Sequence, residues 1–249
     1  MIFRIVTLNL ELNHKGWKTR RDLIAAELPS LSPDIWALNE IHVPSQTGRW
    51  LKDAAEKATG TKYTLLQQSR TGEESRTRAE GLLSRYPVIE SANLDFQSHH
   101  CVALTARLEV GPKCLDVYVT NLINARVEDS ARQYQVARLL EWVRARGGVE
   151  QAVVCGDFNA APDALSIRLM AEVFRPTQVQ ATAFSPLRDP GGDPTHPEWQ
   201  RFDRCIDYIW VPASVKVRAT GLCFNRAVEG NDELWPSDHV GVWADLEFD

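Results

Sequence analysis

Short apolar runs alternate with longer amphipathic stretches along the chain, which is typical of a protein that contains both strands and helices. The runs of strand length lie at residues 2–8, 34–38, 63–66, 101–110, 114–120, 152–155, 205–211, 215–224 and 240–248. Apolar residues recur at helical spacing at residues 17–28, 50–58 and 127–146. Pro29, Gly60 and Gly147 follow these segments and are the expected helix stops.

The connections between these segments predict strands of mixed direction. Gly111 and Pro112 join two strands and predict a hairpin, which is an antiparallel pair. Residues 81–89 look like a strand that Pro87 interrupts, and a short helix is expected after Pro162. Residues 67–80 are polar and charged, so we expect an exposed loop there. Because no linker, repeat or low-complexity tract is present, the pattern predicts one α/β domain over residues 1–249.

Composition narrows the class of protein without fixing a function. Hydrophobic residues make up 44% of the 249 residues and charged residues 24%, which is ordinary for a globular chain. A net charge of −5 gives no global basic signature for nucleic acid. No apolar run approaches the roughly 18 residues of a membrane span, and the N-terminus has no signal-peptide layout. Five scattered cysteines without a CxxC arrangement favour reduced thiols, so we expect a cytoplasmic protein. We also expect a monomer.

The chain is organised around one apolar strand that ends in polar residues. Residues 152–155 are of buried-strand type and run into Gly156, which permits a sharp exit. Asp157 and Asn159 follow, and side chains at i and i+2 project to the same side of an extended chain. We therefore expect a charged acceptor and a neutral amide together at the lip of a sheet. The alternative is an ordinary turn, because Asp, Asn and Gly favour turns.

Other polar residues hold similar positions and could converge on one site. The residues at or just beyond strand ends are Asn9, Glu40, Asn121, Asp157, Asn159, Asp238 and His239. Asp207 lies inside an apolar strand, where a buried carboxylate needs a partner such as Arg204. Carboxylates and amides without a cysteine set or a histidine cluster suit Mg²⁺ or Mn²⁺ and argue against zinc. Taken singly, each residue could instead be a strand-end cap, a turn residue or half of a structural ion pair.

Six short motifs occur in a characteristic order. They are Thr7-Leu8-Asn9-Leu10, Leu38-Asn39-Glu40, Leu82-Leu83-Ser84-Arg85-Tyr86-Pro87, Gly156-Asp157-Phe158-Asn159, Ile206-Asp207-Tyr208-Ile209 and Ser237-Asp238-His239. Together they resemble the endonuclease/exonuclease/phosphatase superfamily, which includes deoxyribonuclease I, AP endonucleases and neutral sphingomyelinases. The resemblance implies an α/β fold of four layers, α/β/β/α, in which two mixed sheets pack face to face and helices flank them.

The resemblance also implies roles at the matching positions. Glu40 matches the metal-binding glutamate, and Asn9 and Asp238 match residues that complete the metal and phosphate environment. Asp157 matches the residue that orients or deprotonates the attacking water. The remaining matches are Asn159, the amide that holds the water or a phosphate oxygen, His239, the histidine beside the scissile phosphate, and Asp207, its carboxylate orienter. This set implies a Mg²⁺ or Mn²⁺ cofactor.

Asn121 departs from the family pattern, because many members carry histidine at this position. An amide can position a phosphate but does not release a proton to a leaving group, so His99, His100 or a water would have to supply one. AP endonucleases are similar in using asparagine near this point. Asn124 and Arg126 follow closely and are candidates for binding a substrate phosphate.

The leading hypothesis is a Mg²⁺- or Mn²⁺-dependent phosphoester hydrolase, most specifically a phosphodiesterase or nuclease. A nucleic-acid substrate rests on Asn121 and on arginines near the expected mouth, namely Arg70, Arg76, Arg78 and Arg126. Residues 176–203, with His196 and Trp199, are too long for a simple connection and could form a substrate-side wall. The alternatives are a phosphatase or phosphodiesterase for lipid head groups or small phosphorylated metabolites, and a non-catalytic binding protein on the same scaffold.

Overall fold

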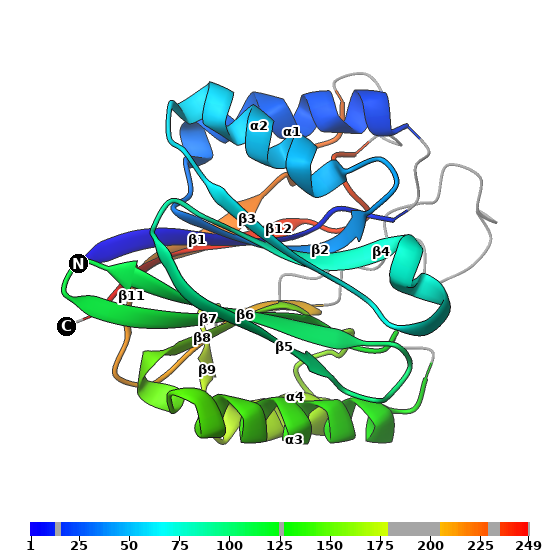
Figure 1. Ribbon diagram of the computed structural model, residues 1–249, viewed down its shortest axis with the longest axis vertical. Coiled ribbons are helices and arrows are strands. Elements are labelled where there is room, and N and C mark those ends of the chain that lie inside the picture. The colour runs from blue at the N-terminus through cyan, green and yellow to red at the C-terminus, as the bar shows by residue number, and fades with distance from the viewer. Residues whose placement is uncertain (13–15, 125–126, 179–204, 229–234, 249) are drawn as a thin grey trace.

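The computed structural model describes residues 1–12, 16–124, 127–178, 205–228 and 235–248, which form two six-stranded sheets (Figure 1). Sheet A has the strand order β11-β12-β1-β2-β4-β3. Its strands are β1 (Ile2–Asn9), β2 (Ile35–His42), β3 (Thr64–Ser69), β4 (Arg78–Ser84), β11 (Lys216–Cys223) and β12 (Gly241–Glu247). Strands β1 and β2 are parallel, and the other neighbours are antiparallel, so the sheet is mixed.

Sheet B is mixed in the same way and has the order β5-β6-β7-β8-β10-β9. Its strands are β5 (Val88–Asp95), β6 (Val102–Val110), β7 (Lys113–Asn121), β8 (Ala152–Asp157), β9 (Arg175–Pro176) and β10 (Asp207–Val211). Strands β6 and β7 form the expected hairpin, whereas β7 and β8 are parallel. The parallel pair is joined by the helix α3 (Asp129–Arg146), as a parallel crossover requires.

Helices cover the outer face of each sheet (Figure 1). The helices α1 (Trp17–Leu31) and α2 (Thr47–Thr59) lie over sheet A, and α3 and α4 (Leu165–Ala171) lie over sheet B. Two short 3-10 helices, η1 (Gly72–Arg76) and η2 (Val149–Gln151), complete the described elements. The expected four-layer α/β/β/α sandwich is therefore confirmed. Among the described residues, no helix combines the length and the apolar character needed to cross a membrane.

The central strands are apolar on both faces because each face has its own partner. In β1, Ile5 belongs to the core between the sheets, whereas Leu8 packs toward α1 and α2. In β8, Val153 faces the same central core and Val154 packs toward α3 and α4. Burial on both faces explains why these strands read as nearly continuous apolar runs rather than alternating ones.

Three sequence expectations are corrected by the structure. Pro29 lies inside α1, and burial of Leu28 and Leu31 sustains the last turn although proline supplies no N–H. Residues 67–80 are an exposed loop only in their middle, around Gly72–Arg76, because β3 continues to Ser69 and β4 begins at Arg78. Residues 81–89 are not one interrupted strand but the parts of two strands, β4 and β5, that belong to different sheets.

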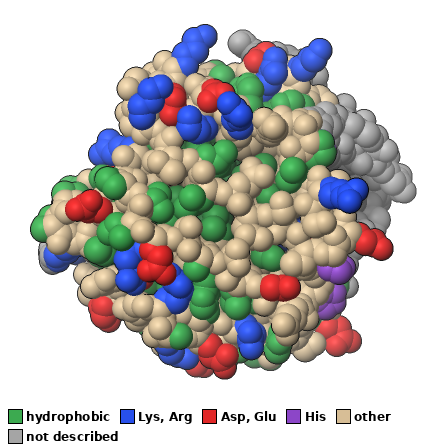
Figure 2. Space-filling model, viewed as in Figure 1, with side chains coloured by type: hydrophobic (Ala, Val, Ile, Leu, Met, Phe, Trp, Pro, Cys, Tyr) green, Lys and Arg blue, Asp and Glu red, His purple; other side chains and the backbone are tan. Residues whose placement is uncertain are grey.

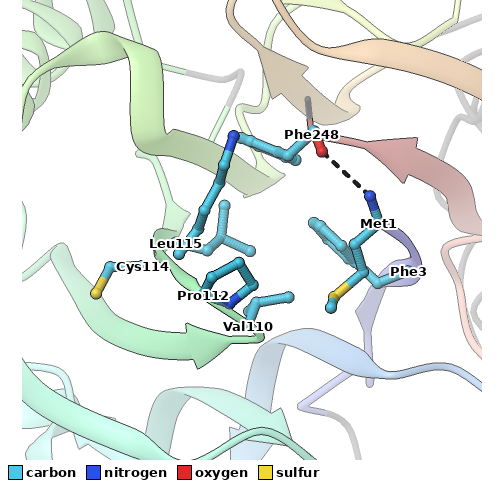
Figure 3. Close-up of a pocket in the computed structure, with 8 residues that line it drawn as sticks. Met1, Phe3, Val110, Pro112, Cys114, Leu115 and Phe248 are labelled. Carbon is cyan, nitrogen blue, oxygen red and sulfur yellow. Dashed lines mark hydrogen bonds between the residues drawn. The ribbon is translucent and has the colours of Figure 1, made fainter.

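Strand direction separates the two ends of the sandwich. At the end where β1 and β7 begin, a cavity of about 250 Å³ is lined by mainly apolar residues (Figure 3): Met1, Phe3, Val110, Pro112, Lys113, Cys114, Leu115 and Phe248. The Met1 ammonium group donates a hydrogen bond to the carbonyl oxygen of Phe248 at 3.2 Å. The polar residues singled out in the sequence lie at the other end, where β1, β2, β7 and β8 finish.

Candidate active site

Asp157 is the last residue of β8, and its carboxylate is held by buried amides. Its side chain is 2% exposed, and Oδ2 accepts hydrogen bonds from Asn9 Nδ2 at 3.3 Å and from Asn159 Nδ2 at 3.2 Å. Oδ1 accepts the backbone N–H of Asn159 at 2.8 Å. Burial raises the pKa of Asp157 to about 7, and the nearby Asp207 and Glu40 carboxylates add to this rise against the opposing effect of His239. A buried carboxyl group with such a pKa is suited to accept a proton near neutral pH.

Asp157 and Asn159 are together for a reason other than the one expected. Asn159 has a φ of 50°, so the chain is not extended after Asp157. A turn instead brings the N–H of Asn159 back to the carboxylate two residues earlier. The turn is therefore realised in the structure, and it places the amide of Asn159 beside the carboxylate of Asp157.

His239 is the second member of the buried cluster. Its Nδ1 lies 2.8 Å from Oδ2 of Asp207, and its Nε2 lies 3.8 Å from Oδ2 of Asp157. Burial by itself lowers the pKa of His239, but Asp207 and Asp157 outweigh it and raise that pKa well above its ordinary value. The imidazole is therefore cationic at neutral pH, and the Asp207 contact fixes its orientation.

These three residues also have the spacing of a metal-ligand group, because one ligand atom from each lies within 4.8 Å of the others. In the structure, however, His239 and Asp207 bond directly to each other. His239 and Asp207 thus form a hydrogen-bonded pair with Asp157 3.8 Å from the imidazole, and the neighbouring carboxylates are the candidate ligands of a cation.

Glu40 lies where β2 departs from regular pairing with β4. The register shifts between Leu38 and Ile41, and Glu40 itself has a φ of 54°. Its Oε1 accepts a hydrogen bond from Arg78 Nη2 at 2.7 Å, and its Oε2 accepts the backbone N–H of Leu12 at 2.9 Å. Burial opposes ionisation, but Arg78 and the other nearby donors prevail and lower the pKa of Glu40 to about 2.

Glu11 is a neighbour of Glu40 that the sequence analysis missed. Its Oε2 lies 3.1 Å from Nη1 of the buried Arg20. Burial raises the pKa of Glu11 to about 8, and Asp238 and Glu40 add to the rise, whereas Arg20 opposes it. The sequence offered one sign of Glu11, namely a carboxylate two residues after Asn9. It lies beyond the end of the strand, whereas the other candidates were chosen at or next to strand ends.

Asp238 completes a group of three carboxylates with Glu11 and Glu40. Burial raises the pKa of Asp238 to about 6, His239 opposes the rise and Glu40 adds to it. Burial is the main cause of the raised pKa values of Glu11 and Asp238, and the neighbouring carboxylates add to it, whereas the pKa of Glu40 is lowered. The carboxylates of Glu11, Glu40 and Asp238 and the amide oxygen of Asn9 are oxygen donors of the kind that could hold a hard divalent cation.

Asn121 and Asn159 lie side by side across the parallel pair β7 and β8. Asn159 Nδ2 is 3.3 Å from Oδ1 of Asn121, and Asn121 is fully buried. Within the described part of the chain, Nδ2 of Asn121 has no hydrogen-bond partner. An unpartnered buried amide donor is costly, by about 1–3 kcal/mol, and so calls for a ligand oxygen or a water.

The residues expected to contact substrate are not all brought to this cluster. Asn124 is exposed, and its carbonyl oxygen accepts a hydrogen bond from Arg132. Arg70 is buried against Glu80, and Arg78 is paired with Glu40, so neither arginine presents a free guanidinium to a substrate. Arg126, His196, Trp199 and Arg204 lie outside the described residues.

Asn39 was assigned no role of its own from the sequence, but in the structure it contacts the backbone of Asp157. It is fully buried, and its Oδ1 accepts the backbone N–H of Asp157 at 3.0 Å. The contacts of Asn39 with Asp157 and of Arg78 with Glu40 escaped the sequence analysis because the partners come from other elements of the fold. Spacing along the chain carries no signal for such contacts.

Comparisons with known proteins identify the family and the fold of the chain. A model of the Endonuclease/Exonuclease/phosphatase family matches residues 6–239. The endonuclease/exonuclease/phosphatase from Bacteroides vulgatus is 18% identical, with a TM-score of 0.79 and coverage of 100% of both chains. D. rerio TDP2 complexed with single strand DNA product is 17% identical, with a TM-score of 0.76 and coverage of 99% of each chain.

The Bacteroides thetaiotaomicron mannosyl-6-phosphatase Bt3783 is 18% identical, with a TM-score of 0.76, and the match covers 99% of this chain and 100% of that one. Among curated proteins, no sequence matches this chain. The structural likenesses are below 25% identity and establish the fold, whereas the family model covers nearly the whole sequence. The chain therefore belongs to the Endonuclease/Exonuclease/phosphatase family, whose members are phosphoesterase hydrolases.

Proposed function

We propose that the chain is a Mg²⁺- or Mn²⁺-dependent phosphodiesterase in which Asp157 activates the attacking water. The observation that carries this proposal is the arrangement around Asp157. Its carboxylate is buried with a raised pKa, and the cationic imidazole of His239 lies 3.8 Å away. A base, the Asp157 carboxylate, and a positive charge, the His239 imidazolium, thus lie next to each other, as hydrolysis of a phosphoester requires.

Asp157 and its amide neighbours would handle the nucleophile. Asn9 and Asn159 each donate to Oδ2 of Asp157 and so hold the carboxylate in one orientation. Held in this way, Asp157 can take a proton from a water directed at the phosphorus atom. The amide of Asn159 also lies close enough to position that water or a phosphate oxygen.

His239 and Asn121 would handle the phosphate. A contact of 3.8 Å is too long for a hydrogen bond between His239 Nε2 and Asp157, so the Nε2–H can donate to a phosphoryl oxygen. Nδ2 of Asn121 is a second buried donor, and it lacks a partner among the described residues. Both groups would stabilise negative charge as it grows on the phosphate.

The carboxylates of Glu11, Glu40 and Asp238, with the amide oxygen of Asn9, are the residues that would hold the divalent cation. When bound, the cation relieves negative charge on the phosphoryl and leaving oxygens. Arg78 holds one oxygen of Glu40 and thereby keeps this carboxylate ionised and oriented. The proposal thus assigns water activation to Asp157 and cation binding to a separate carboxylate group.

A phosphatase or phosphodiesterase for small phosphorylated metabolites or lipid head groups is a second candidate. Two of the arginines expected to bind nucleic acid, Arg70 and Arg78, are engaged with carboxylates. Figure 2 shows acidic and basic side chains interspersed over the viewed face rather than a basic track. The mannosyl-6-phosphatase of the same fold shows that this scaffold also serves a sugar phosphate.

Hydrolysis of bis-p-nitrophenyl phosphate and p-nitrophenyl phosphate, with Mg²⁺, Mn²⁺ or EDTA, tests the proposal. We expect metal-dependent cleavage of the diester. Cleavage of the monoester alone would favour the second candidate. Absence of cleavage together with absence of calorimetric heat on Mg²⁺ titration would contradict metal-dependent hydrolysis and favour a binding protein.

A further inference from the structure

A buried ion pair lies directly behind the candidate active site. Nε of Arg70 is 3.1 Å from Oε1 of Glu80, and the two side chains are 3% and 0% exposed. A fully buried charge pair is seldom retained for stability alone, because desolvation offsets most of its attraction. Further hydrogen bonds of the two side chains reach Asn39 and Asn121.

Hydrogen bonds connect Glu80 to Asp157 through the side chain of Asn39. Oε2 of Glu80 accepts a hydrogen bond from Asn39 Nδ2 at 2.8 Å, and the same Nδ2 donates to the carbonyl oxygen of Thr120 at 2.9 Å. Oδ1 of Asn39 accepts the backbone N–H of Asp157 at 3.0 Å. Asn39 lies on β2 of sheet A, whereas Thr120 and Asp157 lie on β7 and β8 of sheet B, so this amide joins the two sheets.

Arg70 makes the second connection between the sheets. Its Nη2 donates to the carbonyl oxygen of Asn121 at 2.9 Å, and its Nη1 approaches Sγ of Cys101 at 3.5 Å. Arg70 follows β3 of sheet A, whereas Asn121 ends β7 of sheet B. The planar guanidinium therefore links Glu80 to Asn121 with a fixed geometry that a lysine ammonium would not reproduce.

The backbone at Gly156 shows how closely the strands approach here. Gly156 has a φ of +135°, and a Cβ at this position would lie 1.9 Å from the carbonyl oxygen of Thr120 and 3.1 Å from Oδ1 of Asn39. A side chain therefore does not fit between β8, β7 and Asn39. The network holds the strand end immediately before Asp157 at the point of this close approach.

We propose that Asn39, Glu80 and Arg70 are positioning residues, which set the place of the sheet B groups Asp157 and Asn121 relative to the sheet A carboxylates. Apolar contacts between two sheets are not directional, so they do not by themselves fix such a distance. Hydrolysis by groups from both sheets needs placement within about 0.5 Å. This inference rests on the proposed function, because it concerns the same site.

The test compares Arg70→Lys and Asn39→Ala with Arg107→Lys as a matched control. Arg107 pairs with Asp116 at 2.7 Å in sheet B. Asp116 lies on β7 opposite Ala152, the first residue of β8, and so is far from the strand ends that carry Asn121 and Asp157. For diester hydrolysis we expect kcat to fall about tenfold or more in Arg70→Lys and Asn39→Ala, with KM and the Mg²⁺ midpoint within about twofold of the unaltered protein. Arg107→Lys should lower Tm without a comparable fall in kcat.

A double variant adds a measurement that loss of stability does not reproduce. Arg70 and Asn39 both contact Glu80, so their effects should not multiply. The kcat of Arg70→Lys/Asn39→Ala should lie within about threefold of the kcat of whichever single variant is less active. If the fold-loss in kcat of the double variant equals the product of the two single fold-losses, the proposed network is wrong. Equal losses of kcat in Arg70→Lys and Arg107→Lys would also overturn it.

Asp157→Ala separates failure of this inference from failure of the proposed function. If turnover survives in Asp157→Ala, the proposed function itself is wrong. If Asp157→Ala is inactive while Asn39→Ala keeps full kcat, only the positioning role is wrong. Asn39→Ala leaves no buried charge unpaired, so it provides the test even if Arg70→Lys does not fold.

Discussion

Nδ1 of His239 and Oδ2 of Asp207 are 2.8 Å apart, and both side chains are buried. Asp207 begins β10 of sheet B, and His239 lies in the segment that precedes β12 of sheet A, so this contact joins the two sheets. With this partner, and with Asp157 nearby, the pKa of His239 is raised and the imidazole carries a proton at neutral pH. The contact therefore supplies a fixed cation beside the proposed base.

Asp207→Asn tests the role of this contact through a pH profile. The variant removes the charge that raises the pKa of His239 but keeps a side chain of similar size. If protonated His239 is required, activity is lost as pH rises through its pKa, and lowering that pKa moves the basic limb of kcat/KM to lower pH. We expect this shift together with a loss of about 100-fold in kcat. A loss of rate with an unmoved basic limb would contradict the role.

Glu11→Gln tests whether the three carboxylates form the cation site. Removing the Glu11 charge should weaken Mg²⁺ binding by about tenfold or more, as measured by calorimetric titration. The metal-free variant should be more stable than the unaltered protein near pH 8, because burial and the nearby Asp238 and Glu40 disfavour the Glu11 charge by more than the ion pair with Arg20 favours it. Glu172→Gln, an exposed change beyond α4, is the control and should alter neither property. Unchanged Mg²⁺ affinity in Glu11→Gln would remove Glu11 from the site.

The pH dependence of stability in EDTA follows from the same group. Burial and like charges raise the pKa values of Glu11, Asp157 and Asp238 to about 8, 7 and 6. Such carboxyl groups bind more protons in the folded state than in the unfolded state, so the free energy of unfolding falls as pH rises from about 4 to about 8. The raised pKa of His239 acts in the same direction.

Thermal unfolding with and without Mg²⁺ measures this effect. We expect Tm in EDTA to fall between about pH 5 and pH 8, and the increase in Tm on adding Mg²⁺ to be larger at the higher pH. The lowered pKa of Glu40 does not alter this window, because its contribution changes only below about pH 4.5. A Mg²⁺ effect that is independent of pH would contradict the proposed ligands.

Gly156→Ala tests the close approach of β8 to β7. The added Cβ would meet the carbonyl oxygen of Thr120 at 1.9 Å, and the φ of +135° disfavours alanine. We expect a loss of more than about 3 kcal/mol in the free energy of unfolding, measured by urea denaturation. Gly60→Ala is the control, since it also has a positive φ but no heavy atom near the added Cβ, and its loss should be smaller.

Sequence patterns predicted the strand-end positions of several site residues, because strand ends follow from local sequence. The apolar runs placed Asn9, Asn121 and Asp157 at strand ends, and strands that finish at one edge bring such residues together. The patterns predicted exposure along the whole 67–80 segment, which holds around Gly72–Arg76 but not at its ends. Arg70 and Glu80 are buried there because each neutralises the other, and this pairing depends on the antiparallel contact of β3 and β4.

The contacts missed by the sequence analysis share one property. Asn39 and Arg78 act on partners that lie 118 and 38 residues away along the chain, at Asp157 and Glu40 respectively. Hydrogen bonds of this kind follow from tertiary packing, and no periodicity or spacing signals them. Glu11 was closer to detection, since it lies two residues beyond Asn9, but its φ of 57° belongs to a turn rather than to the strand.

The most direct test of the account is the Mg²⁺-dependent cleavage of bis-p-nitrophenyl phosphate by Asp157→Ala beside the unaltered protein. The buried Asp157 carboxylate is the only base assigned to the water, so we expect kcat to fall by at least about 100-fold while the folded state persists by circular dichroism. A folded Asp157→Ala variant that retains the turnover of the unaltered protein would contradict the central claim.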